Sequence, residues 1–142
     1  MTDTVTIHPA GAAEGEIVTV RPEAEVMTRQ RLPNFVGISQ ATAGSTGINM
    51  NLVVIPPGGA AEPHFHRGFE TAIYILEGEV RTRYGLNLAK ETINHTGDFL
   101  FIPAGVPHQP INLSDSRPAR AIVARNDPNE QESVVPYSQG NS

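Results

Sequence analysis

The stretch GGAAEPHFHRGFE, residues 58–70, holds the densest cluster of metal-capable side chains in the chain. Successive side chains of an extended strand point to opposite faces, so His64 and His66 project to the same side. Two imidazoles on one side can bind one ion, and Glu70 can add an anionic oxygen. The alternative for this stretch alone is a solvated strand face with two ordinary polar histidines.

A second stretch, GDFLFIPAGVPHQPIN at residues 97–112, carries a further histidine, His108. Together the two stretches resemble the paired motifs of the cupin superfamily. These are small β-barrels whose metal is held by two histidines and a glutamate of the first motif and one histidine of the second. The second motif matches throughout, at Gly97, Pro103, Gly105, His108 and Asn112.

The resemblance implies a metal site built from His64, His66, Glu70 and His108. The first motif departs from the family pattern, because one extra residue lies between Glu70 and Gly78. A shift of one along a strand moves a side chain to the opposite face, and counting back from Gly78 places Thr71 at the usual ligand position. Either a β-bulge near Gly68 turns Glu70 back toward the metal, or the protein ligands are three histidines with waters.

Length and composition restrict the class of protein. The 142 residues predict one domain with a core of its own, and the absence of cysteine excludes disulfides and thiolate ligands. Scattered basic residues and a net charge of -5 argue against a nucleic-acid partner. Neither a signal sequence nor an apolar run of roughly 18 residues is present, so we expect a cytoplasmic protein without membrane contact.

Short β-prone runs separated by Pro and Gly turns predict an all-β barrel or sandwich between Ile17 and Arg125. The cupin resemblance selects a double-stranded β-helix, or jelly roll. We expect an N-terminal arm at residues 1–15, the barrel at 16–126 and a polar tail at 127–142 that is disordered or lies over the surface. The arm can pair with a neighbouring subunit's sheet edge, so we expect a homodimer.

Three local interpretations follow from the period of two along a strand. Asn49 and Asn51 share one face of the strand at residues 48–55, where they either line a cavity or face solvent, and solvent is the preferred interpretation. Residues 71–76 and 80–84 are interpreted as a hairpin around Gly78. The candidate walls of a ligand pocket are the aromatic residues Phe65, Phe69, Tyr74, Phe99 and Phe101.

Three neutral imidazoles and one carboxylate would leave a divalent ion with a net charge of about +1 and open coordination positions. The ligand types suit Zn, Mn, Fe, Ni, Co or Cu, and the sequence does not select among them. The resemblance extends from Phe35 to Pro136, to small single-domain cupins related to polyketide cyclases and dioxygenases. It therefore implies a cyclase, isomerase or dioxygenase acting on a small oxygenated molecule. A non-catalytic small-molecule sensor and a purely structural barrel are the alternatives, and no catalytic residue is assigned.

Overall fold

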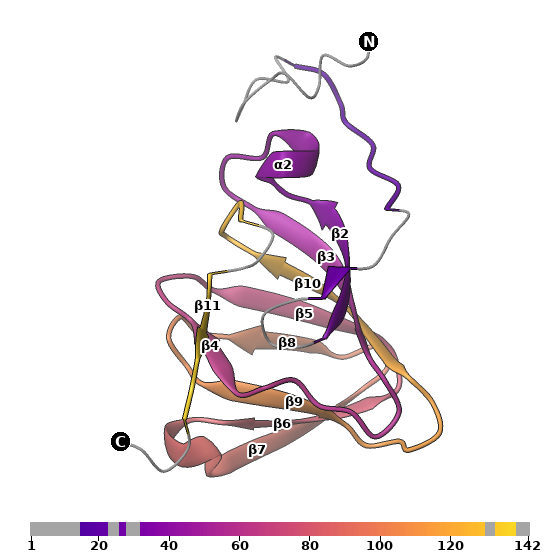
Figure 1. The fold of residues 1–142 in the computed structure, drawn as a ribbon, viewed down its shortest axis with the longest axis vertical. Coiled ribbons are helices and arrows are strands. Elements are labelled where there is room, and N and C mark those ends of the chain that lie inside the picture. Colours follow the sequence, from indigo (N-terminus) through magenta and orange to yellow (C-terminus); the bar gives the residue numbers. More distant parts are fainter. Residues whose placement is uncertain (1–14, 23–25, 28–31, 130–132, 139–142) are drawn as a thin grey trace.

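Two antiparallel sheets face each other in the computed structural model, which describes residues 15–22, 26–27, 32–129 and 133–138 (Figure 1). The six-stranded sheet has the order β1 (Val26–Met27), β2 (Pro33–Ile38), β3 (Asn49–Ile55), β10 (Ala119–Arg125), β5 (Thr71–Glu77) and β8 (Phe99–Ile102). The five-stranded sheet has the order β11 (Val134–Pro136), β4 (His64–His66), β9 (His108–Asn112), β6 (Glu79–Tyr84) and β7 (Lys90–His95). The predicted all-β jelly roll is confirmed.

Helical structure is limited to two short elements in the described residues, α2 (Gln40–Ala43) and η1 (Leu86–Leu88). The start of α2 is fixed by a capping box, in which Thr42 N donates to Ser39 Oγ and Ser39 N donates to Thr42 Oγ1. Neither helix approaches the length and apolarity that crossing a bilayer requires. Residues 1–14 of the predicted arm lie outside the described residues.

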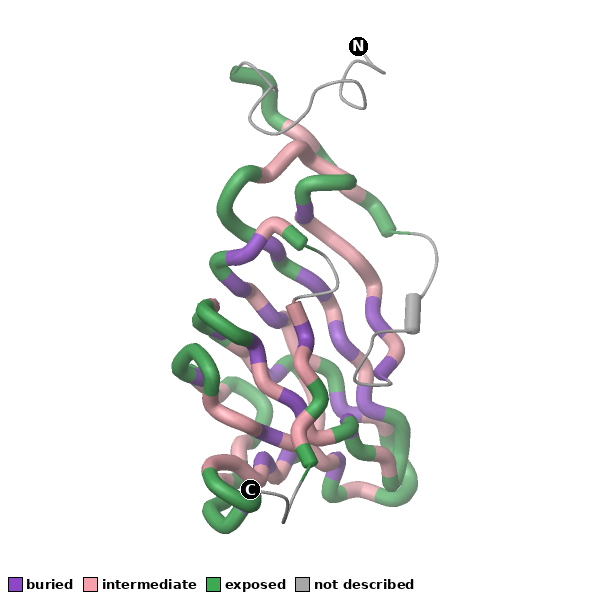
Figure 2. The backbone as a smooth tube through the Cα atoms, turned by 60° about the vertical axis from the view of Figure 1, so that its left-hand side comes forward, coloured by how far each residue is buried: buried purple, intermediate pink, exposed green. Residues whose placement is uncertain are grey.

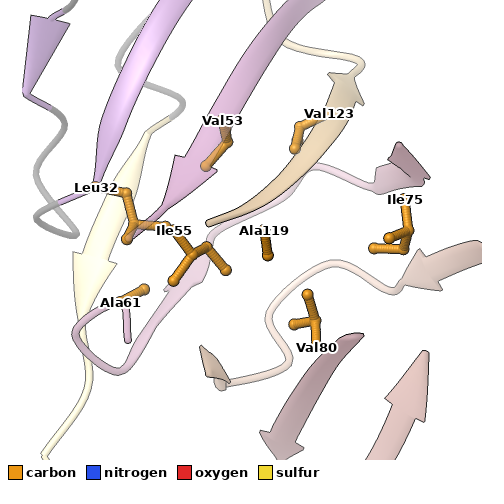
Figure 3. Close-up of a cluster of buried hydrophobic side chains, with 8 residues drawn as sticks. All are labelled: Leu32, Val53, Ile55, Ala61, Ile75, Val80, Ala119 and Val123. Atoms are coloured by element: carbon orange, nitrogen blue, oxygen red, sulfur yellow. The ribbon is translucent and has the colours of Figure 1, made fainter. Parts of the chain in front are cut away.

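The apolar core lies between the two sheets (Figure 3). It contains Leu32, Val53, Ile55, Ala61, Ile75, Val80, Ala119 and Val123. Strands β3, β5 and β10 each contribute alternate residues to it, as a half-buried strand requires. Burying each large aliphatic side chain contributes about 1.5–3 kcal/mol, so this cluster fixes the spacing of the sheets on which the site is built.

The predicted hairpin around Gly78 is wrong, because the strands before and after it belong to different sheets. Strand β5 pairs with β10 and β8, whereas β6 pairs with β7 and β9. At the crossing, Gly78 has a φ of 95°, and a Cβ there would lie 3.1 Å from the Cβ of Ala119. Glycine is therefore required both by the backbone conformation and by the close approach of β10.

The interpretation of Asn49 and Asn51 as solvent-facing is also wrong, since both are buried. The Asn49 Nδ2 group donates to the carbonyl oxygen of Asp127 at 2.6 Å, and Gly37 N donates to Asn51 Oδ1 at 3.2 Å. These amides serve backbone groups that would otherwise be buried without partners. The apolar alternate residues of β3, including Met50, consequently point outward.

Part of the predicted tail, residues 127–142, forms a strand. Strand β11 pairs with β4 along its whole length, with Val134 opposite His66 and Pro136 opposite His64 (Figure 1). Figure 2 shows buried positions in this segment as well as in the barrel strands. The side chain of Asp127 is buried and accepts hydrogen bonds from Asn129 N and Ser133 Oγ. The described part of the tail thus protects an edge of the sheet that carries two of the histidines.

Candidate metal centre

Three buried histidines from two neighbouring strands meet inside the barrel. His64 and His66 are the alternate residues of β4, and His108 opens β9 directly opposite His64. Their exposed fractions are 3%, 2% and 4%. One ring nitrogen from each can be chosen so that all three lie within 4.8 Å of one another. The convergence of three imidazoles, predicted from two separated motifs, is therefore present in the structure.

Backbone carbonyl groups fix the orientation of two of these rings. The Nδ1 atom of His64 lies 2.7 Å from the oxygen of Glu62, and Nδ1 of His108 lies 2.9 Å from the oxygen of Val106. A carbonyl oxygen only accepts, so each Nδ1 must carry the proton and donate it. The unprotonated Nε2 atom of each neutral ring is then the one available to a metal, as in many histidine metal sites.

The electrostatics of the cluster keep these rings neutral. Burial lowers the pKa of His64 from 6.5 to about 4, with a smaller lowering by the positive charge of Arg125. Burial also lowers the pKa of His108 to about 3, and the neighbouring His64 and Arg125 lower it further. A metal binds only the neutral imidazole. These two ligands are therefore ready for a cation at neutral pH without first losing a proton.

The geometry fits one transition metal ion after a small closure of the rings. Nitrogen atoms bound to one ion at about 2.1 Å lie about 3–3.4 Å apart, compared with separations of up to 4.8 Å among the three histidines. The ring centroids of His64 and His108 are already 4.3 Å apart, and those of His64 and His66 are 4.9 Å apart. Side-chain rotations that move each ring nitrogen by about an ångström would bring the three nitrogen atoms to these distances. The donor set is nitrogen only, which suits Zn, Mn, Fe, Ni, Co or Cu.

Glu70, predicted as the fourth ligand, does not join the histidines. It is exposed, and its backbone N–H donates to Asn126 Oδ1 at 2.8 Å. The next residue, Thr71, opens β5 and is buried, with an exposed fraction of 1%. The extra residue before Gly78 therefore has the effect anticipated from strand parity. It puts a threonine where the carboxylate would face inward, and only three of the four predicted ligands come together.

The residue beside Thr71 was not anticipated from the sequence. Arg125, the last residue of β10, lies opposite Thr71 in the sheet and is 4% exposed. Its Nε donates to Thr71 Oγ1 at 2.7 Å. It lines a cavity of about 50 Å³ together with His64 and His108. The inward parity of Ala119, Ala121, Val123 and Arg125 was a usable signal, but arginine is commonly assigned to the surface.

A larger cavity of about 310 Å³ adjoins the site and shares His108 with the small one. Its walls combine apolar residues with the hydroxyl groups of Thr82, Tyr84 and Thr92. The aromatic walls predicted from sequence are partly wrong, because Tyr74 and Phe99 contact each other on the outer side of the six-stranded sheet, where Phe99 is 80% exposed. Phe101 does line this cavity, as predicted, together with its β8 neighbours Leu100 and Ile102.

A comparison with family models matches residues 51–125 to the cupin domain. The matched part is more than half of the chain and contains all three histidines, so the chain belongs to the cupin family. No curated protein matches the sequence significantly.

Solved structures share the fold at low sequence identity. A Lactobacillus farciminis oxalate decarboxylase in complex with formate is 21% identical, with a TM-score of 0.66; the match covers 80% of this chain and 33% of that one. A Bacillus subtilis oxalate decarboxylase with Mn(II) centres is 19% identical, with a TM-score of 0.63. That match covers 84% of this chain and 30% of the decarboxylase. An uncharacterised double-stranded β-helix protein from Klebsiella pneumoniae is 16% identical, with a TM-score of 0.64. That match covers 84% of this chain and 91% of the Klebsiella protein. This chain therefore spans about a third of each decarboxylase.

Proposed function

We propose that this protein is a metal-dependent small cupin that acts on a small oxygenated organic molecule. His64, His66 and His108 would hold one divalent transition metal, and the adjoining cavity would receive the substrate. The reaction would be of the cyclase, isomerase or dioxygenase type. The observation that carries the proposal is the meeting of three buried imidazoles, two of them orientated by backbone carbonyl groups.

The chain's own residues supply the surroundings for such chemistry. A bound divalent ion would polarise an oxygen donor of the substrate or lower the pKa of a bound water. The hydroxyl groups of Thr82 and Tyr84 lie in the cavity wall, where they can form hydrogen bonds with an oxygenated ligand. The side chains of Leu100 and Val106 restrict water beside His108 and orient the apolar part of a ligand.

Manganese is one of the metals that this donor set accepts, and Mn(II) centres occur in the structurally similar Bacillus subtilis oxalate decarboxylase. That likeness, at 19% identity, supports the fold and not the reaction. Elemental analysis of the purified protein is therefore needed to identify the ion among Mn, Fe, Co, Ni, Cu and Zn.

A non-catalytic small-molecule sensor is the second candidate. Among the described residues, the wall of the 310 Å³ cavity includes no carboxylate and no lysine, so its groups for proton transfer are limited to His108 and Tyr84. A reaction that needs a separate general acid or base would be poorly served there. Binding without turnover requires only the metal and the cavity.

Elemental analysis of protein purified without added metal tests the metal site. We expect close to one transition metal per chain, and its loss in His64→Ala and His108→Ala. The matched control is His95→Ala, because His95 is exposed and pairs with Glu79 away from the cluster. Substoichiometric metal that is insensitive to the first two substitutions would overturn the proposal.

Turnover separates the enzyme from the sensor. Protein reconstituted with Fe, Mn or Cu would be tested for oxygen uptake with catechols and diketones, and with each ion for conversion of the same compounds without oxygen. Conversion that is lost in His108→Ala supports an enzyme. Tight binding of a compound with no conversion by any metal form would support the sensor.

A further inference from the structure

We propose that Arg125 and Thr71 form an anion-binding subsite beside the metal centre, so that the ligand is a small organic carboxylate or a related oxyanion. This inference rests on the proposed function, because the subsite is argued to act together with the metal. It goes further by naming the chemical class of the ligand.

The guanidinium group of Arg125 is held in a fixed position on the wall of the small cavity. Arg125 lies between two neighbours in the six-stranded sheet, opposite Thr71 on β5 and opposite Asn49 on β3. Its Nε–H donates a hydrogen bond to the hydroxyl oxygen of Thr71, and this bond holds the planar guanidinium group in a fixed direction. The same side chain lines the small cavity with His64 and His108. A charged donor is thus held on the wall of the metal cavity.

The site would have a higher positive charge than a centre with three histidines and a glutamate. With an inward glutamate, three neutral imidazoles and a divalent ion would give a net charge of about +1. Here Glu70 is exposed and the inward position is Thr71, so the same ion would carry about +2. The positive charge of Arg125, which lines the same cavity as His64 and His108, adds to this. Such a site favours an anionic ligand over a neutral one.

The two neighbouring cavities differ in size. The small cavity of about 50 Å³ has room for a carboxylate-sized group between Arg125 and the histidines. His108 and Ile102 also line the 310 Å³ cavity, which has mostly apolar walls. A ligand with a carboxylate head and a short apolar or aromatic body would fill both spaces. Benzoate is a simple probe with this form.

The test is an optical titration of the Co(II)-loaded protein with benzoate and with benzamide, its neutral analogue of similar shape. We expect benzoate to perturb the cobalt absorption and to bind at least about 10-fold more tightly than benzamide, as a charge-assisted contact implies. Arg125→Gln should weaken benzoate binding by about 10-fold or more at unchanged cobalt content. The control Arg120→Gln, an exposed position on the same strand, should have no effect.

The outcomes distinguish the subsite from the metal centre. Failure to retain cobalt would overturn the proposed function. Retention of cobalt with equal affinity for benzoate and benzamide would overturn the subsite alone. A preference for benzoate that Arg125→Gln leaves unchanged would assign the preference to the metal ion and also overturn the subsite. Equal affinity for the two probes is measured on the unaltered protein, so it overturns the subsite even if Arg125→Gln does not fold.

Discussion

Acidification is expected to destabilise the metal-free protein through two buried imidazoles. The pKa of His64 is lowered from 6.5 to about 4, chiefly by burial, and that of His108 to about 3, chiefly by burial and then by the neighbouring His64. In the unfolded chain both would titrate near 6.5. Protonation is therefore easier in the unfolded chain than in the folded one.

The direction and size of the effect follow from proton linkage. Well above pH 6.5 both rings are neutral in either state and add no pH dependence. As the pH falls below 6.5 the unfolded chain takes up protons that the folded chain does not, so stability falls until the folded rings titrate at about pH 4 and about pH 3. At about pH 5 each ring accounts for a loss of about 2 kcal/mol. The pair together would lose about 4 kcal/mol, a large part of a typical total of about 5–15 kcal/mol.

Urea unfolding followed by circular dichroism, with chelator present, measures this loss. The wild type is compared at about pH 8 and about pH 5 with the double variant His64→Gln and His108→Gln, which lacks both titrating groups. Other groups titrate equally in the two proteins, so the difference isolates the pair. We expect the wild type to lose about 4 kcal/mol more than the variant. Equal losses in both proteins would show that the two rings are not held neutral by the fold.

Three further substitutions test the roles of Glu70, Asn112 and Gly78. Glu70→Gln should leave the metal content unchanged, because Glu70 is exposed, and a clear loss of metal by elemental analysis would identify it as a ligand. Asn112→Ala should cost about 3 kcal/mol in urea unfolding, because the Asn112 amide bonds three carbonyl oxygens and accepts a fourth contact from a backbone N–H; a cost below about 1 kcal/mol would contradict this. Gly78→Ala should cost about 1–3 kcal/mol, since its φ is 95° and Ala119 lies close by. Gly47→Ala, where no atom lies within 4 Å, is its control, and equal midpoints for the two variants would be the contrary result.

The parts of the site that local spacing determines could be predicted from the sequence. His64 and His66 are two residues apart, so any strand there puts them on one side. The position of Thr71 followed from counting along the strand to Gly78, where the chain must turn. Arg125 was missed because a buried arginine is uncommon, and its burial depends on Thr71, a residue far away in the sequence.

The orientation of whole strands was harder to predict. A period of two shows which residues share a face but not which face points inward, and β3 has apolar residues on both. Asn49 was therefore assigned to solvent and Tyr74 to the pocket, both in the wrong direction. The prediction of a hairpin at Gly78 was wrong for a related reason. The partners of β5 and β6 are chosen by strands distant in the chain, and a short turn can equally well carry the chain from one sheet to the other.

Anomalous diffraction at the absorption edge of zinc or cobalt, from crystals of the loaded protein, shows directly whether the three imidazoles bind a single ion. We expect one strong peak about 2.0–2.1 Å from a ring nitrogen of each of His64, His66 and His108, with Nε2 as the ligand atom of His64 and His108. A peak held by fewer than three of these rings, or no peak within the barrel, would contradict this expectation.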